Sequence, residues 1–84
     1  MNPLQKQFIK ILKQEGLFNW EVVKIKSGGG LCLYNHKQIL LDENNYNLPF
    51  FLHELTHALL PNIKNHNSIW ADKYTSLLVK YNKN

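Results

Sequence analysis

The chain has 84 residues, of which 44% are hydrophobic and 19% are charged, and this composition predicts one small globular domain over residues 1–84. Cys32 is the only cysteine, which excludes an internal disulfide and a four-cysteine zinc ribbon. The positive charge comes from ten lysines and no arginine, and the net charge is +4. Sequence-specific DNA readers usually depend on arginine. The lysines therefore leave open only a weak, salt-sensitive association with nucleic acid.

The sequence carries no signal for a membrane or for secretion. No apolar stretch approaches the length of a transmembrane helix. The N-terminus lacks the apolar core and the small-residue cleavage site of a signal peptide, and a small secreted domain would usually contain several disulfides. We therefore expect a cytoplasmic protein that does not bind a membrane.

The first half of the chain predicts one helix followed by three strands. Asn2 and Pro3 suit the N-cap and the first helical position, and hydrophobic residues then recur at helical spacing up to Gly16. This pattern predicts an amphipathic helix over residues 3–15. Three runs rich in strand-forming side chains follow, at residues 20–26, 31–34 and 38–41. The last two runs are expected to pair as a hairpin.

The second half predicts two helices, which complete an α+β fold. Leu48 and Pro49 open the first of them, which is apolar on most sides and is expected to be the buried central helix as far as Pro61. After a loop, Ser68 is a candidate N-cap for a C-terminal helix. Six side chains of that helix are expected to face the core, namely Ile69, Trp70, Tyr74, Leu77, Leu78 and Tyr81. The predicted order is an N-terminal helix, a small three-stranded antiparallel or mixed sheet, a central helix and a C-terminal helix.

The central helix carries the sequence His53-Glu54-Leu55-Thr56-His57. Histidines four residues apart lie on one face of a helix, one turn from each other, within reach of one metal ion. Neutral imidazoles bind zinc without cancelling its charge, and the adjacent Glu54 can accept a proton from a zinc-bound water. Two histidines and a glutamate within an apolar helix are costly unless a ligand satisfies them. The pattern therefore favours a zinc site over a structural role for these side chains.

A catalytic zinc site needs a third protein ligand and leaves its fourth position for water. His66 is the preferred candidate, because the loop before it reverses the chain and would bring its ring back over the central helix. Asp72, in the first turns of the last helix, and His36, in the hairpin turn, are the alternatives. A carboxylate near a helix N-terminus and a histidine in a turn also have ordinary structural explanations.

Four further features have structural interpretations. Trp70 and Tyr74 follow helical spacing and are expected to pack in the core rather than line a cleft. Cys32 is expected to be a small buried residue. The run Ser27-Gly28-Gly29-Gly30 matches no phosphate-binding motif and is expected to be a mobile turn.

The histidine motifs resemble those of a known group of enzymes. The segment from His53 to His57, followed after a short loop by residues 66–70, is similar to the SprT-like zinc metalloproteases and the related minimal gluzincin-type peptidases. Those enzymes combine a His-Glu-x-x-His helix with a downstream histidine, which an aromatic residue often follows. The order of the preceding helix and strands also fits.

The resemblance implies a zinc-dependent metallohydrolase that acts on a peptide or protein, with the chain as one minimal metallopeptidase-like catalytic domain. It implies Glu54 as the general base and three zinc ligands, which are His53, His57 and His66. An edge strand near the cleft could pair with an extended substrate, and we expect that strand at residues 38–41. The alternative function is a non-catalytic binding module that a structural metal stabilises.

Overall fold

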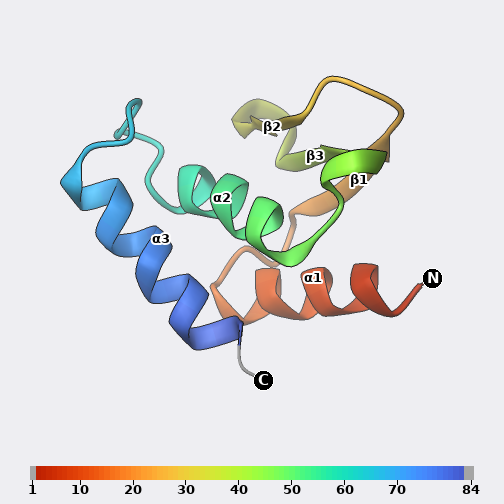
Figure 1. Cartoon of the computed structure of the whole chain (residues 1–84), viewed down its shortest axis with the longest axis horizontal. Helices are drawn as coiled ribbons and strands as arrows, with labels where there is room; N and C mark the ends of the chain where they lie inside the picture. Colours follow the sequence, from red (N-terminus) through yellow and green to blue (C-terminus); the bar gives the residue numbers. More distant parts are fainter. Residues whose placement is uncertain (1, 83–84) are drawn as a thin grey trace.

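Residues 2–82 form three α-helices and a three-stranded mixed sheet in the computed structural model (Figure 1). In chain order the elements are α1 (Pro3–Gln14), β1 (Glu21–Ile25), β2 (Gly30–Leu33), β3 (Gln38–Asp42), α2 (Leu48–Leu59) and α3 (Ser68–Tyr81). Two short 3-10 helices flank β3, η1 (Tyr34–His36) and η2 (Glu43–Asn45). The predicted α+β class and the predicted order of elements are confirmed.

β3 is the central strand of the sheet. It pairs in parallel with β1 and antiparallel with β2, so the predicted hairpin of β2 and β3 is confirmed. The expectation that residues 38–41 form an edge strand is wrong, because the apolar side chains of Ile39 and Leu41 are fully buried and the strand has a neighbour on each side. The edge strand that contacts α2 is β2, and its outer edge has no strand partner among the described residues.

α2 is the buried central helix that the sequence predicts. It contacts α1, α3, β2 and β3. Phe51 and Leu55 on this helix are fully buried, and the ring of Phe51 stacks on that of Phe8 in α1 with centroids 4.2 Å apart. Because these side chains anchor α2 in the core, the direction in which His53 and His57 point is fixed as well.

Each of the three α-helices begins after an asparagine that caps it. The side-chain oxygens of Asn2, Asn47 and Asn67 accept hydrogen bonds from backbone N–H groups three residues further on, at 2.7, 3.0 and 3.0 Å. The prediction of Asn2 as the cap of α1 is confirmed. The cap of α3 is Asn67 and not Ser68, so His66 lies directly before a fixed helix start.

α3 packs on α2 through one face and is tied to α1 near its C-terminal end. Trp70 is buried, whereas Ile69 is 57% exposed, so the expectation that Ile69 faces the core is wrong. Neighbouring positions on a helix point about 100° apart, and only one of these two side chains can face α2. At the other end of α3, Lys80 Nζ donates a hydrogen bond to Glu15 Oε2 at 2.8 Å, and the Tyr81 hydroxyl contacts the same oxygen.

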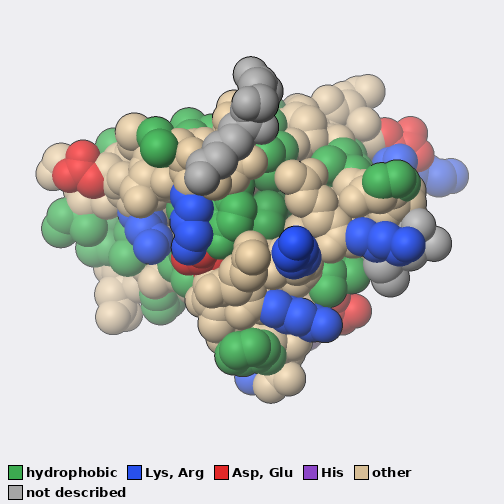
Figure 2. Space-filling view, turned by 90° about the horizontal axis from the view of Figure 1, so that it is seen from below, with side chains coloured by type: hydrophobic (Ala, Val, Ile, Leu, Met, Phe, Trp, Pro, Cys, Tyr) green, Lys and Arg blue, Asp and Glu red, His purple; other side chains and the backbone are tan. Residues whose placement is uncertain are grey.

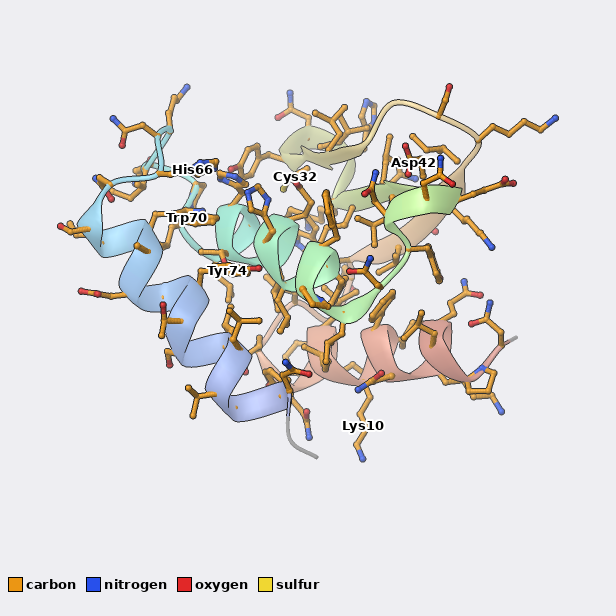
Figure 3. The ribbon with its side chains drawn as sticks, viewed as in Figure 1. Lys10, Cys32, Asp42, His66, Trp70 and Tyr74 are labelled. Carbon is orange, nitrogen blue, oxygen red and sulfur yellow. The ribbon has the colours of Figure 1, made fainter. Side chains whose placement is uncertain are left out.

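The face of the molecule on which α1 lies is rich in lysine. Lys6, Lys10 and Lys13 surround Ile9 in a shallow hollow, and Figure 2 shows lysine side chains with apolar side chains between them on this face. Lys10 lies on the opposite side of the molecule from His66 (Figure 3). Within residues 2–82, no helix has the length and apolar character that crossing a membrane requires.

Asp42 is a buried carboxylate that organises the chain before β2. Its Oδ2 accepts a hydrogen bond from the backbone N–H of Gly29 at 2.8 Å, and its Oδ1 accepts bonds from the backbone N–H and the side-chain amide of Asn45 at 2.9 and 2.8 Å. Gly29 has a φ of 76°, which favours glycine. The Asp42 side chain therefore holds the turn from which β2 and Gly30 start.

Replacing Asp42 by alanine should lower the free energy of unfolding by about 3 kcal/mol, because three hydrogen-bond donors lose their acceptor. The measurement is urea denaturation followed by circular dichroism. Asp72→Ala is the matched control, since Asp72 is exposed on α3, and it should cost less than about 1 kcal/mol. Equal effects of the two substitutions would contradict a structural role for the Asp42 hydrogen bonds.

Candidate metal centre

His53 and His57 lie one turn apart on α2, and both rings are half-buried. His66 comes from the loop between α2 and α3 and is exposed. The three side chains converge, so that one ring nitrogen from each lies within 4.8 Å of those from the others. The side chains that the sequence selects as metal ligands are thus brought together, and they are close enough to hold one metal ion.

The spacing of two of these nitrogens fits a shared ion. His57 Nε2 and His66 Nε2 are 3.1 Å apart. Two nitrogens bound to one tetrahedral ion at about 2.05 Å would be about 3.3 Å apart. The same separation suits a hydrogen bond in which one ring donates and the other accepts, and a shared metal ion would replace that bond.

The Trp70 ring packs against all three rings of the histidine cluster. Its ring centroid lies 4.9 Å from that of His53, 5.2 Å from that of His57 and 4.2 Å from that of His66. Trp70 is 5% exposed, so it cannot move without opening the contact of α3 with α2. Because Asn67 caps α3 with a hydrogen bond from the Trp70 backbone N–H, the chain on both sides of the cap is held in place.

The electrostatics of the cluster favour a neutral His57 ring. Burial lowers the pKa of His57, and the neighbouring His53 and His66 rings lower it further against the opposing charge of Glu54. Since an unperturbed histidine titrates at about 6.5, a lowered pKa leaves His57 neutral at pH 7. The neutral ring is the form that binds a metal ion, because protons compete for the same lone pair.

Glu54 is 6% exposed and lies between His53 and β2. Its Oε2 is 2.9 Å from His53 Nδ1. A His53 ring that donates its Nδ1–H to this carboxylate keeps the lone pair of Nε2 free for a metal ion. Glu54 therefore orients a candidate ligand, and it also faces the cleft that the three histidines line.

Gly30 on β2 makes room for this carboxylate. A Cβ atom at Gly30 would lie 3.0 Å from Glu54 Oε2 and 3.3 Å from Glu54 Cγ, which is too close without a shift of the glutamate. The sequence predicts only a mobile turn for this glycine run. The close approach of β2 to α2 that gives Gly30 its importance has no signature in the sequence.

The cleft itself is about 350 Å³ in volume, and β2 and η1 form its second wall. Cys32 and Tyr34 lie on that wall, and neither was predicted to be near the site. The Tyr34 hydroxyl donates a hydrogen bond to the backbone carbonyl of His57 at 2.8 Å, which joins η1 to the end of α2. Cys32 is half-buried, and burial together with the charge of Glu54 raises the pKa of its thiol to about 11, so it is protonated at neutral pH.

The other candidate ligands lie outside the cluster. Asp72 on α3 and His36 in η1 are both exposed, and neither belongs to the group of side chains that could share an ion with the three histidines. Trp70 packs as the sequence predicts, and its ring also contacts the candidate ligands. Tyr74 is half-buried, but it lines a hollow beside His53, which the sequence did not indicate.

The chain matches no protein family, and it matches no curated protein and no solved structure. The function must therefore be argued from the geometry of the cleft and from the motif that builds it.

Proposed function

We propose that the chain is a zinc-dependent metallohydrolase that cleaves peptide bonds, with His53, His57 and His66 as zinc ligands and Glu54 as general base. The observation that carries this proposal is the convergence of the three histidine side chains in an open cleft with a buried carboxylate beside the first of them. The resemblance of the two motifs to the SprT-like zinc metalloproteases supports the same assignment.

The donor set favours zinc among the common metals. Imidazole nitrogens suit zinc, whereas magnesium and calcium prefer oxygen ligands. Catalytic zinc sites usually have three protein ligands and an open position, whereas structural sites have four and are closed. The described residues offer three donors in an open cleft, which supports catalysis over a purely structural metal.

When bound, a zinc ion would supply Lewis acidity, which can polarise a carbonyl group and lower the pKa of water. Glu54 removes a proton from the attacking water and returns it to the nitrogen of the departing amine. The carboxylate is suited to this work because it is held at the edge of the cleft by His53 and by the close approach of Gly30. His53, His57 and His66 bind and orient the ion.

Replacing any one of the three histidines by alanine should weaken zinc binding at least about a hundredfold, because loss of even an indirect support of a metal ligand costs 10- to 100-fold. The affinity is measured by competition with a chromogenic chelator. His36→Ala is the matched control, since His36 is an exposed histidine outside the cluster. If replacing a histidine of the cluster lowered the zinc affinity no more than His36→Ala does, the histidine of the cluster would not be a ligand.

Glu54→Gln should abolish most peptide hydrolysis, by a factor of about a hundred or more, because the amide cannot act as a base. Zinc content after dialysis should stay at one ion per chain. The rate is measured with a casein-derived peptide mixture by labelling new amino groups. The control is Glu43→Gln, which changes an exposed glutamate in η2. Unchanged hydrolysis in Glu54→Gln would remove Glu54 from the mechanism.

Gly30→Ala should lower kcat by about threefold to tenfold while zinc still binds. The new methyl group must displace the Glu54 carboxylate by a few tenths of an ångström, and a misplacement of about 1 Å costs about a hundredfold. The positive φ values of this run belong to Gly28 and Gly29 and not to Gly30, so alanine fits the backbone. Ser27→Ala in the same run is the control. A variant with normal kcat would show that Glu54 does not need its present position.

A further inference from the structure

A second hollow adjoins the cleft at the N-terminal end of α2. It has a volume of about 210 Å³ and is lined by Pro49, Phe50, His53 and Tyr74. Phe50 is 40% exposed and forms part of the wall of this hollow. Figure 3 shows Tyr74 in the space between α3 and α2, close to Trp70. The hollow therefore lies at the junction of these two helices.

The hollow and the proposed catalytic cleft share one lining side chain, which is His53. His53 lines both, while Glu54, His57 and His66 line the cleft alone. The His53 ring is 5.9 Å from the Tyr74 ring and 6.5 Å from the Phe50 ring, measured between centroids. A peptide bond held at the metal ligands would thus have one neighbouring side chain within reach of the hollow.

The residues that line the hollow favour an apolar side chain of a substrate. None of the four lining residues carries a fixed charge, so a lysine, arginine, aspartate or glutamate of a substrate would be desolvated without an ionic partner. The Tyr74 hydroxyl donates its hydrogen bond to the backbone carbonyl of Pro49 at 3.3 Å, so Tyr74 presents mainly its ring to the hollow. Aromatic and large aliphatic side chains gain most from contact with such walls.

We infer that this hollow, which we call the Phe50 hollow, is a substrate subsite that binds an aromatic or large aliphatic side chain next to the scissile peptide bond. The inference rests on the proposed function, because it takes the histidine cleft as the place of cleavage. It adds the substrate class, which is peptides with an apolar residue beside the cleaved bond.

The main test measures binding rather than turnover. Two pairs of hydroxamates are titrated into the zinc-loaded full chain, and binding is measured by calorimetry. The two members of each pair differ only by one benzyl group. This group lies on the acyl side in the first pair and on the amine side in the second. We expect the benzyl compound of one pair to bind at least about tenfold more tightly than its partner. Phe50→Ala should remove most of this gain. Phe18→Ala is the matched control, as Phe18 is 70% exposed and outside the hollow, and it should leave the gain unchanged.

The outcomes separate the two proposals. Absence of a benzyl gain in both pairs, or a gain that survives Phe50→Ala, would overturn the subsite and leave the zinc hydrolase intact. A benzyl gain lost in Phe50→Ala, together with no cleavage of any peptide, would show that the hollow binds an apolar side chain but would overturn its role as a substrate subsite along with the hydrolase.

A metal-independent measurement keeps the subsite testable if zinc does not bind. In the zinc-free chain, N-acetyl-phenylalaninamide should shift the ring resonances of Phe50 and Tyr74 in NMR spectra and leave those of Phe18 in place. Equal shifts at Phe18 and Phe50 would indicate non-specific contact and would overturn the inference.

Discussion

The packing of the Trp70 ring against three imidazoles is the contact on which the candidate site depends. His66 is exposed and lies in a loop, so on its own it would sample many positions. Trp70 and the cap at Asn67 restrict those positions, because the first is buried between two helices and the second fixes the helix start one residue after His66. The third donor is therefore positioned by the core of the domain and by a cap, although its own side chain is on the surface.

The buried polar side chains differ in the kind of hydrogen-bond partner that they have. Asp42 accepts three hydrogen bonds, and Thr56 Oγ1 donates one to the backbone carbonyl of Leu52 at 2.7 Å. Glu54 is equally buried, but its hydrogen-bond partner is the ring of a candidate metal ligand. Since burying a carboxylate is costly and a small domain has little stability to spare, this placement is easier to explain by chemistry in the cleft than by folding.

The parts of the structure that could be predicted from the sequence are those that short-range chemistry determines. The spacing of His53 and His57 requires only one helix, and the Asn2 cap requires only the first turn of another. The parts that could not be predicted depend on how distant segments meet. Nothing local distinguishes β3 as the central strand, and the burial of its two apolar side chains follows from the neighbours on either side.

The same limit explains why two residues near the site have no signature in the sequence. Gly30 matters because β2 approaches α2 closely, and Tyr34 matters because η1 reaches the end of that helix. Neither approach leaves a pattern along the chain. His66 was the exception, since a short loop between two helices constrains where its ring can lie, and the structure brings it to the other histidines as expected.

The position of His53 links the proposed metal site to the proposed subsite. One edge of its ring contacts the buried carboxylate, another side faces the other two histidines, and the ring also forms part of the Phe50 hollow. A substrate side chain in that hollow would contact a metal ligand directly, so binding of the side chain and orientation of the ligand would be coupled through one rigid ring. Under the proposed function, His53 would therefore help to bind the ion, to hold the base and to shape the subsite.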